Sequence, residues 1–165
     1  MKGGGLHVLL TNDDGIDATG LKLLREELRQ HVARVTTIAP DANRSGVSRS
    51  ISFGRPVAVT RVAEDASGPS FACSGSPVDC VRVGLLSELL GPVDLVVAGI
   101  NHGHNVGDDV AMSGTVGAAM EAALLGVAGV ALSQQGDDGG TGDFRFNDTG
   151  FLIRFPQVAA AVRIA

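Results

Sequence analysis

Short apolar runs separated by helical segments constrain the fold of this chain more than any other feature. The four runs cover residues 6–10, 34–39, 93–98 and 127–132. Helical segments lie between them, at residues 18–29, 76–90 and 115–125. The first run is almost entirely Leu and Val, as expected for a strand buried on both faces of a parallel sheet. Strands that alternate with helices predict an α/β fold with a doubly wound, mostly parallel sheet.

Local signals set the ends of these elements and predict further ones. Ser76, Pro77 and Asp79 supply a helix cap, a first helical residue and an acid in the first turn. That helix should end near Leu90, before a Gly-Pro pair. Short strands are expected at 51–53 and 56–62, polar loops at 42–50 and 99–113, a turn-like mobile tract at 136–142 and a last helix from Asn147 toward Ala165.

Composition limits the class of protein. The 165 residues are 44% hydrophobic and 19% charged, which suits a single folded domain over residues 1–165. The net charge of −5 argues against a general surface for nucleic-acid polymers. No apolar stretch reaches the roughly 18 residues of a membrane span, and the glycine-rich start lacks the pattern of a secretory signal. We therefore expect a soluble, cytoplasmic protein that has no membrane partner.

The two cysteines, Cys73 and Cys80, have no Cys or His neighbours at the spacing of zinc ligands. We interpret them as reduced thiols, with Cys80 packed on a helix. A disulfide between them is the less favoured alternative in a chain with a good core.

Two adjacent carboxylates, Asp13 and Asp14, follow the first apolar run and precede Gly15. They lie in a strand-to-helix loop, at the end of a parallel strand where open α/β sheets bind ligands. Adjacent carboxylates repel each other and are costly to desolvate unless a cation or strong donors compensate them. A divalent cation would meet this need. Alternatively, the pair caps the following helix while Gly15 makes the turn, and the motif alone supports both interpretations equally.

Three polar loops follow strands of the predicted sheet and should converge at one of its edges. They cover residues 12–15, 43–48 and 101–109. The side-chain oxygens of Asp, Ser and Asn suit a hard cation such as Mg²⁺ or Mn²⁺ better than zinc. Their chemistry does not distinguish Ser45 from Ser48 as the serine ligand.

Ser113, Gly114 and Thr115 stand at the start of the alanine-rich helix, whose amides and dipole favour an anion. A phosphate there could bridge to the cation, which predicts metal-assisted hydrolysis of a phosphate ester. Taken alone, however, the three residues fit a helix cap with close packing better than a phosphate site.

Other polar residues of these loops carry weaker signals. For His102 and His104 we favour a solvated or supporting role over metal binding or proton donation. Arg44 could pair with a substrate phosphate through its fork of donors, although exposed loop arginines are common. For Asp108 and Asp109 the pattern favours interaction with a helix dipole or with water.

Four segments together resemble the SurE (stationary-phase survival protein) family of metal-dependent nucleotidases. They are L-L-T-N-D-D-G-I-D-A-T-G-L from Leu9, A-P-D-A-N-R-S-G-V-S-R-S-I-S from Ala39, S-G-S-P-V-D-C-V from Ser74 and D-L-V-V-A-G-I-N-H-G-H-N-V-G-D-D-V-A-M-S-G-T-V-G-A-A-M-E from Asp94. They occur in the family's order and cover roughly residues 6–133. A four-part match of this length is more specific than any single motif.

The resemblance implies a Rossmann-like, three-layer fold and a site for one divalent metal ion, Mg²⁺ or Mn²⁺. It assigns the metal ligands as Asp13, Asp14, Ser45 and Asn101, with Asp13 and Asn101 also catalytic. It implies phosphate contacts from Asn43, Ser113, Gly114 and Thr115. Ser45 is thereby selected over Ser48.

The resemblance also implies hydrolysis of nucleoside monophosphates, as 5′- or 3′-nucleotides, and of short polyphosphate, by a homodimer or homotetramer. Two features depart from the family. Met112 stands where members usually carry an aromatic residue or histidine, and the family's C-terminal portion has no recognisable counterpart here. The alternative function is therefore a metal- and nucleotide-binding domain without turnover. A dinucleotide-dependent oxidoreductase is excluded, because N-D-D-G rather than G-x-G-x-x-G follows the first strand.

Overall fold

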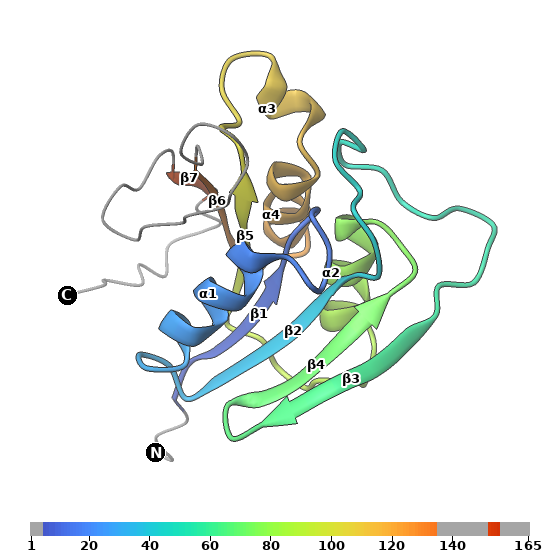
Figure 1. Ribbon diagram of the computed structural model, residues 1–165. Coiled ribbons are helices and arrows are strands. Elements are labelled where there is room, and N and C mark those ends of the chain that lie inside the picture. The colour runs from blue at the N-terminus through green and yellow to red at the C-terminus, as the bar shows by residue number, and fades with distance from the viewer. Residues whose placement is uncertain (1–4, 135–151, 156–165) are drawn as a thin grey trace.

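A computed structural model describes residues 5–134 and the backbone of residues 152–155. The strands are β1 (His7–Thr11), β2 (Arg34–Pro40), β3 (Val59–Asp65), β4 (Gly68–Cys73), β5 (Leu95–His102), β6 (Ala128–Gln134) and β7 (Leu152–Phe155). The helices are α1 (Thr19–Leu28), α2 (Pro77–Leu86), α3 (Asp109–Met112) and α4 (Gly114–Leu124). The strands form one sheet in the order β3-β4-β2-β1-β5-β6-β7 (Figure 1).

The sheet is parallel from β4 through β2, β1 and β5 to β6, and the edge strands β3 and β7 pair antiparallel with their neighbours. The predicted α/β fold with a mostly parallel sheet is therefore confirmed. From β1 the chain builds outward through β2 to β4, then returns to form β5 and β6 on the other side of β1. The direction of winding reverses between β1 and β5, which is where open α/β sheets bind ligands.

Helix α1 covers one face of the sheet, and α2 and α4 cover the other, which gives three layers (Figure 1). Residues of β1 contribute to both cores in turn, because successive side chains of a strand point to opposite faces. Val8 and Leu10 belong to the core that contains Leu21 of α1, whereas Leu9 belongs to the core that contains Ala118 of α4. Among the described helices, none is long and apolar enough to cross a membrane.

Helix α2 begins as predicted and ends earlier. Ser76 Oγ accepts the Asp79 amide at 3.1 Å, and Asp79 Oδ2 accepts the Ser76 amide at 2.8 Å, which is a reciprocal capping box. The helix ends at Leu86 rather than near Leu90. Ser87 terminates it, because its backbone is extended and its hydroxyl donates to a carbonyl of the last turn.

The segment between β2 and α2 departs most from the sequence prediction. Residues 51–53 are not a strand, and the strand predicted at 56–62 lies at 59–65 as β3. Strand β4, which pairs with both β2 and β3, was not predicted. Its sequence, Gly-Pro-Ser-Phe-Ala-Cys, contains no β-branched residue, so its conformation depends on its neighbours in the sheet rather than on local preference.

Both cysteines, Cys73 at the end of β4 and Cys80 on α2, are buried free thiols, as predicted. A hydrogen bond from Cys80 lowers the pKa of Cys73, whereas burial raises the pKa of Cys80. The pair therefore packs as part of the core.

Strand β5 continues past its predicted end at Ala98 and reaches His102. Its pairing with β6 shifts between Ala98 and Asn101. Gly99 lies in this shift with φ of 132°, and a Cβ on it would stand 2.4 Å from the Leu132 carbonyl oxygen. Only glycine fits there. The shift brings Asn101 to the edge of the sheet next to the loop that follows β1.

The chain's last described element is a strand where the sequence predicted a helix. Residues 152–155 form β7, paired antiparallel with β6, so the helix predicted from Asn147 toward Ala165 is wrong over these residues. In a segment of only four residues, the spacing of apolar side chains fits a strand and a helix equally well, so the pattern does not separate the two. The rest of that predicted helix and the tract at 136–142 lie outside the described residues.

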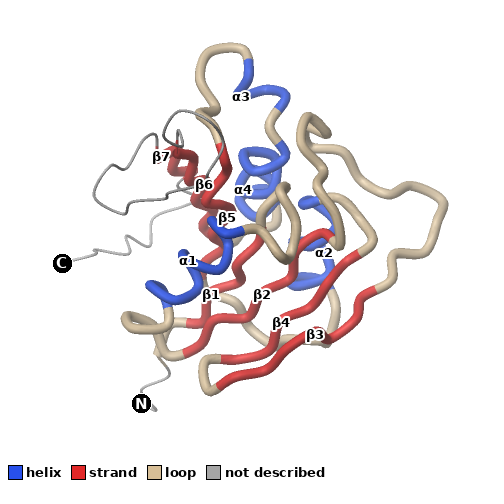
Figure 2. Tube along the Cα trace, viewed as in Figure 1, coloured by secondary structure: helices blue, strands red, loops and turns tan. Residues whose placement is uncertain are grey.

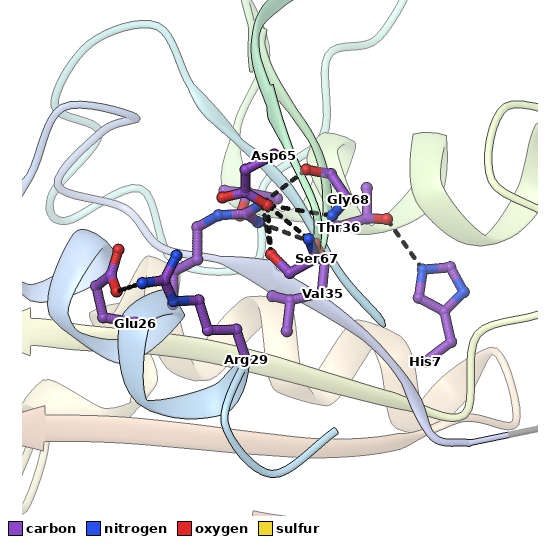
Figure 3. A network of polar contacts seen from close by, with 10 residues as sticks. His7, Glu26, Arg29, Val35, Thr36, Asp65, Ser67 and Gly68 are labelled. Atoms are coloured by element: carbon purple, nitrogen blue, oxygen red, sulfur yellow. Dashed lines mark hydrogen bonds and ion pairs between the residues drawn. The ribbon is translucent and has the colours of Figure 1, made fainter. Parts of the chain in front are cut away.

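Arg25 connects α1 to the turn between β3 and β4. Its guanidinium donates to the Val35 carbonyl at 2.9 Å and the Gly68 carbonyl at 2.7 Å, and pairs with Asp65 at 2.9 Å. Figure 3 labels these three partners. The Ser67 hydroxyl and Arg25 together lower the pKa of Asp65 to about 2. One arginine thus connects α1, β2 and the hairpin.

Candidate functional site

The loop after β1 is fixed by its own side chains and backbone. Asn12 is fully buried; its Nδ2 donates to the Gly15 carbonyl at 2.9 Å and its Oδ1 accepts the Gly15 amide at 3.2 Å. Gly15 has φ of 108°, a conformation that favours glycine. Helix α1 begins only at Thr19, with Ala18 in the capping position. The alternative that Asp13 and Asp14 cap this helix is therefore wrong.

Asp13 instead contacts the start of α4. Its carboxylate is buried and accepts the Thr115 hydroxyl at 2.7 Å and the Thr115 amide at 3.2 Å. The approach is close: a Cβ on Gly114 would lie 2.9 Å from the Asp13 Cβ. The positive end of the α4 dipole favours this negative charge. Each carboxylate oxygen accepts one hydrogen bond here and retains capacity to bind a cation.

Asp14 connects the β1 loop to β5. Its Oδ2 accepts the backbone amide of His102 at 3.1 Å. Burial raises the pKa of Asp14, and the negative charge of Asp13 raises it further, whereas the His102 amide acts in the opposite direction. A cation between the carboxylates would oppose both effects that raise the pKa.

The loop after β2 reaches the same place. The Arg44 amide donates to the Asp13 carbonyl at 2.6 Å, and the Ser45 amide donates to Asn43 Oδ1 at 2.8 Å. Ser45 is exposed beside this contact. The Arg44 guanidinium pairs with Asp41 of its own loop at 3.0 Å and donates to the carbonyl of Ser74, between β4 and α2, at 3.4 Å.

Asn101, near the end of β5, is half-buried and oriented by its own turn. Its Nδ2 donates to the Gly103 carbonyl at 2.9 Å, so its Oδ1 is the end that could bind a cation. The loops that follow β1, β2 and β5 lie at one edge of the sheet (Figure 2). The structure thus brings together the backbones that carry the predicted metal ligands, namely Asp13, Asp14, Ser45 and Asn101.

The donor set fits a hard divalent cation. The four side chains offer carboxylate, hydroxyl and amide oxygens, the ligands preferred by Mg²⁺ and Mn²⁺. Across residues 5–134, no three or more His, Cys, Asp and Glu side chains gather as a metal centre. A cation here would therefore depend on Ser45 and Asn101 as well as on the two carboxylates.

The residues predicted to contact phosphate have other partners in the structure. Ser113 Oγ accepts the Val116 amide at 3.1 Å and caps α4, so the helix cap that the motif predicts is present. Thr115 gives its hydroxyl and amide to Asp13. Asn43 Oδ1 accepts the Ser45 amide. Phosphate contacts from these residues and Gly114 stay predictions.

The outer loop between β5 and α4 carries the weaker candidates on its surface. His102 and His104 are exposed, in keeping with a solvated or supporting role. Asp108 occupies the capping position of α3, and Asp109 lies in its first turn. The position of Asp109 in the first turn agrees with the predicted interaction of an acidic residue with a helix dipole.

Sequence reasoning missed the tertiary contacts of two acidic residues near the site, Asp79 and Glu121. Asp79 of α2 accepts the Ser52 amide and hydroxyl in addition to capping its own helix. Glu121 of α4 is buried and pairs with Arg49 and Arg82. A signal for Glu121 existed: a lone charge inside an alanine-rich apolar helix must find partners when that helix is buried.

Comparison with known proteins gives a consistent result. The sequence matches the family described as "Survival protein SurE" over residues 8–161. It is 51% identical to the 5′-nucleotidase SurE of Rubrobacter xylanophilus over 129 residues, covering 78% of this chain and 48% of that protein. It is 49% identical to the 5′-nucleotidase SurE of Vibrio campbellii over 133 residues, covering 79% of this chain and 49% of that protein.

The fold is also shared with a solved structure. The crystal structure of a SurE protein from Aquifex aeolicus matches with a TM-score of 0.71 and 40% identity, over 80% of this chain and 52% of that chain. The present chain spans about half the length of the relatives that it matches.

Proposed function

The chain belongs to the SurE survival-protein family, and we propose that it is a metal-dependent phosphomonoesterase acting on nucleoside monophosphates. The observation that carries the proposal is the meeting of three loops at the switch between β1 and β5, with Asp13 and Asp14 at their centre. The relatives' activity, named as 5′-nucleotidase, supports the substrate class. We extend the proposal to 3′-nucleotides and to short polyphosphate.

In this proposal, one Mg²⁺ or Mn²⁺ ion is held by Asp13, Asp14, Ser45 and Asn101. When bound, such an ion supplies Lewis-acid polarisation of the phosphoryl group. The protein's part is to keep the ligands in place before substrate arrives. Thr115 holds the Asp13 carboxylate, the His102 amide holds Asp14, and the Gly103 carbonyl sets the orientation of Asn101.

The proposed contacts to substrate lie at the same edge of the sheet as the proposed metal ligands. We propose that Asn43, Ser113, Gly114 and Thr115 contact the phosphate. The start of α4 supports this, since amides at a helix N-terminus favour anions. Thr115 already donates its amide and hydroxyl to Asp13, whereas Ser113 Oγ accepts the Val116 amide. The phosphate would therefore share the Thr115 donors or draw on the Ser113 hydroxyl and the Gly114 amide.

Phosphate release from nucleoside monophosphates tests the proposal. The chain should hydrolyse them with Mn²⁺ or Mg²⁺ and stop when a chelator removes the metal. Asp13→Asn keeps the size of the side chain but loses its charge, and should lower the rate at least about 100-fold. Asp17→Asn is a matched control, because Asp17 lies in the same connection with its side chain 94% exposed.

Three outcomes distinguish the interpretations. Hydrolysis that persists after chelation, or in Asp13→Asn, would contradict a metal-dependent reaction at this site. Calorimetric binding of Mn²⁺ and nucleotide without hydrolysis would instead support a binding domain without turnover. As a positive control, the relative from Rubrobacter xylanophilus is assayed in parallel to show that the conditions suit a 5′-nucleotidase.

We further propose a homodimer or homotetramer located in the cytoplasm, with neither a nucleic-acid polymer nor a membrane as partner. Family membership supports this proposal. Sedimentation of the purified chain should give the mass of two or four copies, and a monomer would contradict it.

A further inference from the structure

Glu121 of α4 is a buried carboxylate held by two arginines from different elements. Its side chain is 4% exposed; Oε2 pairs with Arg49 at 2.6 Å and Oε1 pairs with Arg82 at 2.7 Å. The two arginines are similarly exposed, at 45% and 42%. Arg82 belongs to α2, so its pair joins two helices that already pack together. Arg49 belongs to the loop that carries Asn43 and Ser45.

The loop lies directly on α4 where Arg49 reaches Glu121. A Cβ on Gly117 would be 2.8 Å from the Ser48 carbonyl oxygen and 3.0 Å from the Arg49 Cα, so backbone meets backbone. Ser48, with φ of 55°, donates its amide to the Met112 carbonyl at 2.9 Å. This non-glycine left-handed residue costs conformational energy, which the surrounding contacts must offset.

The segment that contains Ser45 is therefore fixed at both of its ends by contacts with other elements. On one side, the Arg44 amide donates to the Asp13 carbonyl at 2.6 Å. On the other side, Ser48 and Arg49 hold to the end of α3 and to α4. If the contacts of Ser48 and Arg49 were loosened, Ser45 could move relative to Asp13.

We infer that Arg49 is a positioning residue for the cation site. Its ion pair with Glu121 holds residues 45–48 against α4 and thereby sets where the Ser45 hydroxyl lies relative to the two carboxylates. This inference rests on the proposed function for the identity of the bound ion. The tethering of the loop rests on the hydrogen bonds and ion pairs alone.

Arg82 supplies a matched control within the same network. Arg49→Met and Arg82→Met each remove one guanidinium from Glu121 while keeping an aliphatic stem, at nearly equal distance and exposure. A purely structural role predicts the same effect from both variants. A positioning role predicts that only Arg49→Met affects the cation.

The experiment measures Mn²⁺ affinity by calorimetry and amide hydrogen exchange of residues 45–48 in the whole chain. We expect Arg49→Met to weaken Mn²⁺ binding about tenfold, the lower range for residues that orient metal ligands, and to speed exchange in this segment. Arg82→Met should change Mn²⁺ affinity less than about twofold, with a similar loss in melting temperature. Arg49→Lys, which keeps the charge, should recover part of the affinity.

Equal effects from the two variants, or no effect from Arg49→Met, would overturn the inference. Failure of the proposed function would look different: the unmodified chain would neither bind Mn²⁺ nor release phosphate. The exchange comparison would still decide whether Arg49 tethers the loop. Faster exchange in both variants alike, or in neither, would refute the tether.

Discussion

At Asp13 a single buried carboxylate serves two elements. It lies in the loop that follows β1 and accepts the amide and the hydroxyl of Thr115 at the start of α4. A carboxylate in this position satisfies one of the helix's unpaired amides and benefits from its dipole. The same contacts fix the orientation of the side chain, which is what a metal ligand requires.

Removing the Thr115 hydroxyl tests this arrangement. Thr115→Val keeps the shape of the side chain but leaves Asp13 without its 2.7 Å hydrogen bond. We expect a loss of about 1–3 kcal/mol in the free energy of unfolding, since the bond is buried and one partner is charged. Mn²⁺ affinity by calorimetry should fall about tenfold. Thr115→Ser retains the hydroxyl and should keep most of both, so an equal loss in Thr115→Ser would contradict the assigned role.

The contact of α4 with the β2 loop makes Gly117 an unusual helical glycine. Alanine within a helix is ordinarily favoured over glycine by about 1 kcal/mol. Here the added Cβ would lie 2.8 Å from the Ser48 carbonyl oxygen. Gly117→Ala should therefore destabilise the protein, opposite in sign to helix propensity, when measured by chemical denaturation. An increase in stability would show that the loop yields easily.

The connection of α1 to the β3–β4 hairpin should depend on acid pH. Hydrogen bonding to Ser67 and the ion pair with Arg25 lower the pKa of Asp65 to about 2, below its ordinary value of 3.8. The unfolded chain therefore binds a proton first as pH falls. The stabilisation is complete above about pH 5 and is lost between about pH 4 and 2.

Asp65→Asn checks this dependence. Because the Asp65 side chain is 42% exposed, we expect its charge to contribute less than about 1 kcal/mol at neutral pH. The stability difference from the unmodified protein should shrink below pH 4 in denaturation experiments. Glu64→Gln, which alters an exposed ion pair on the same strand, should show little such trend. A difference that stays constant down to pH 2 would contradict the assignment.

Elements with strong local signals were predictable, and those that depend on neighbours were not. The capping residues of α2 and the apolar run of β1 predict these elements directly from the sequence. Strand β4 carries no such signal, because its pairing with β2 and β3 is a tertiary contact. For the site, the loops and their meeting point followed from topology. The contact of Thr115 with Asp13 did not, since 102 residues separate the two in sequence.

At the scale of the molecule, the proposed site combines function with a cost in stability. Burial and the charge of Asp13 raise the pKa of Asp14 above its ordinary value, so the ionised carboxylate opposes folding at neutral pH. Asp14→Asn should therefore stabilise the metal-free chain while weakening Mn²⁺ binding. Thermal melting with chelator and with Mn²⁺ measures both effects.

The expected pattern has two parts. In the unmodified chain, Mn²⁺ at 100 times its dissociation constant should add about 2.7 kcal/mol of stability. In Asp14→Asn this increment should largely vanish, although the chelated protein melts at a higher temperature. An Mn²⁺ increment of the same size in both proteins would place the ion elsewhere.

The outer strand β3 bears on how copies of this protein meet. Six of its seven residues are exposed, and its pairing with β4 is interrupted between Arg61 and Ala63. Arg61 and Glu64 form an ion pair along it. A strand from another molecule would have to match an irregular backbone and strip water from these charges before it could pair. The β3 edge of the sheet therefore resists pairing with strands of other molecules, which limits aggregation at the high protein concentrations of a cell.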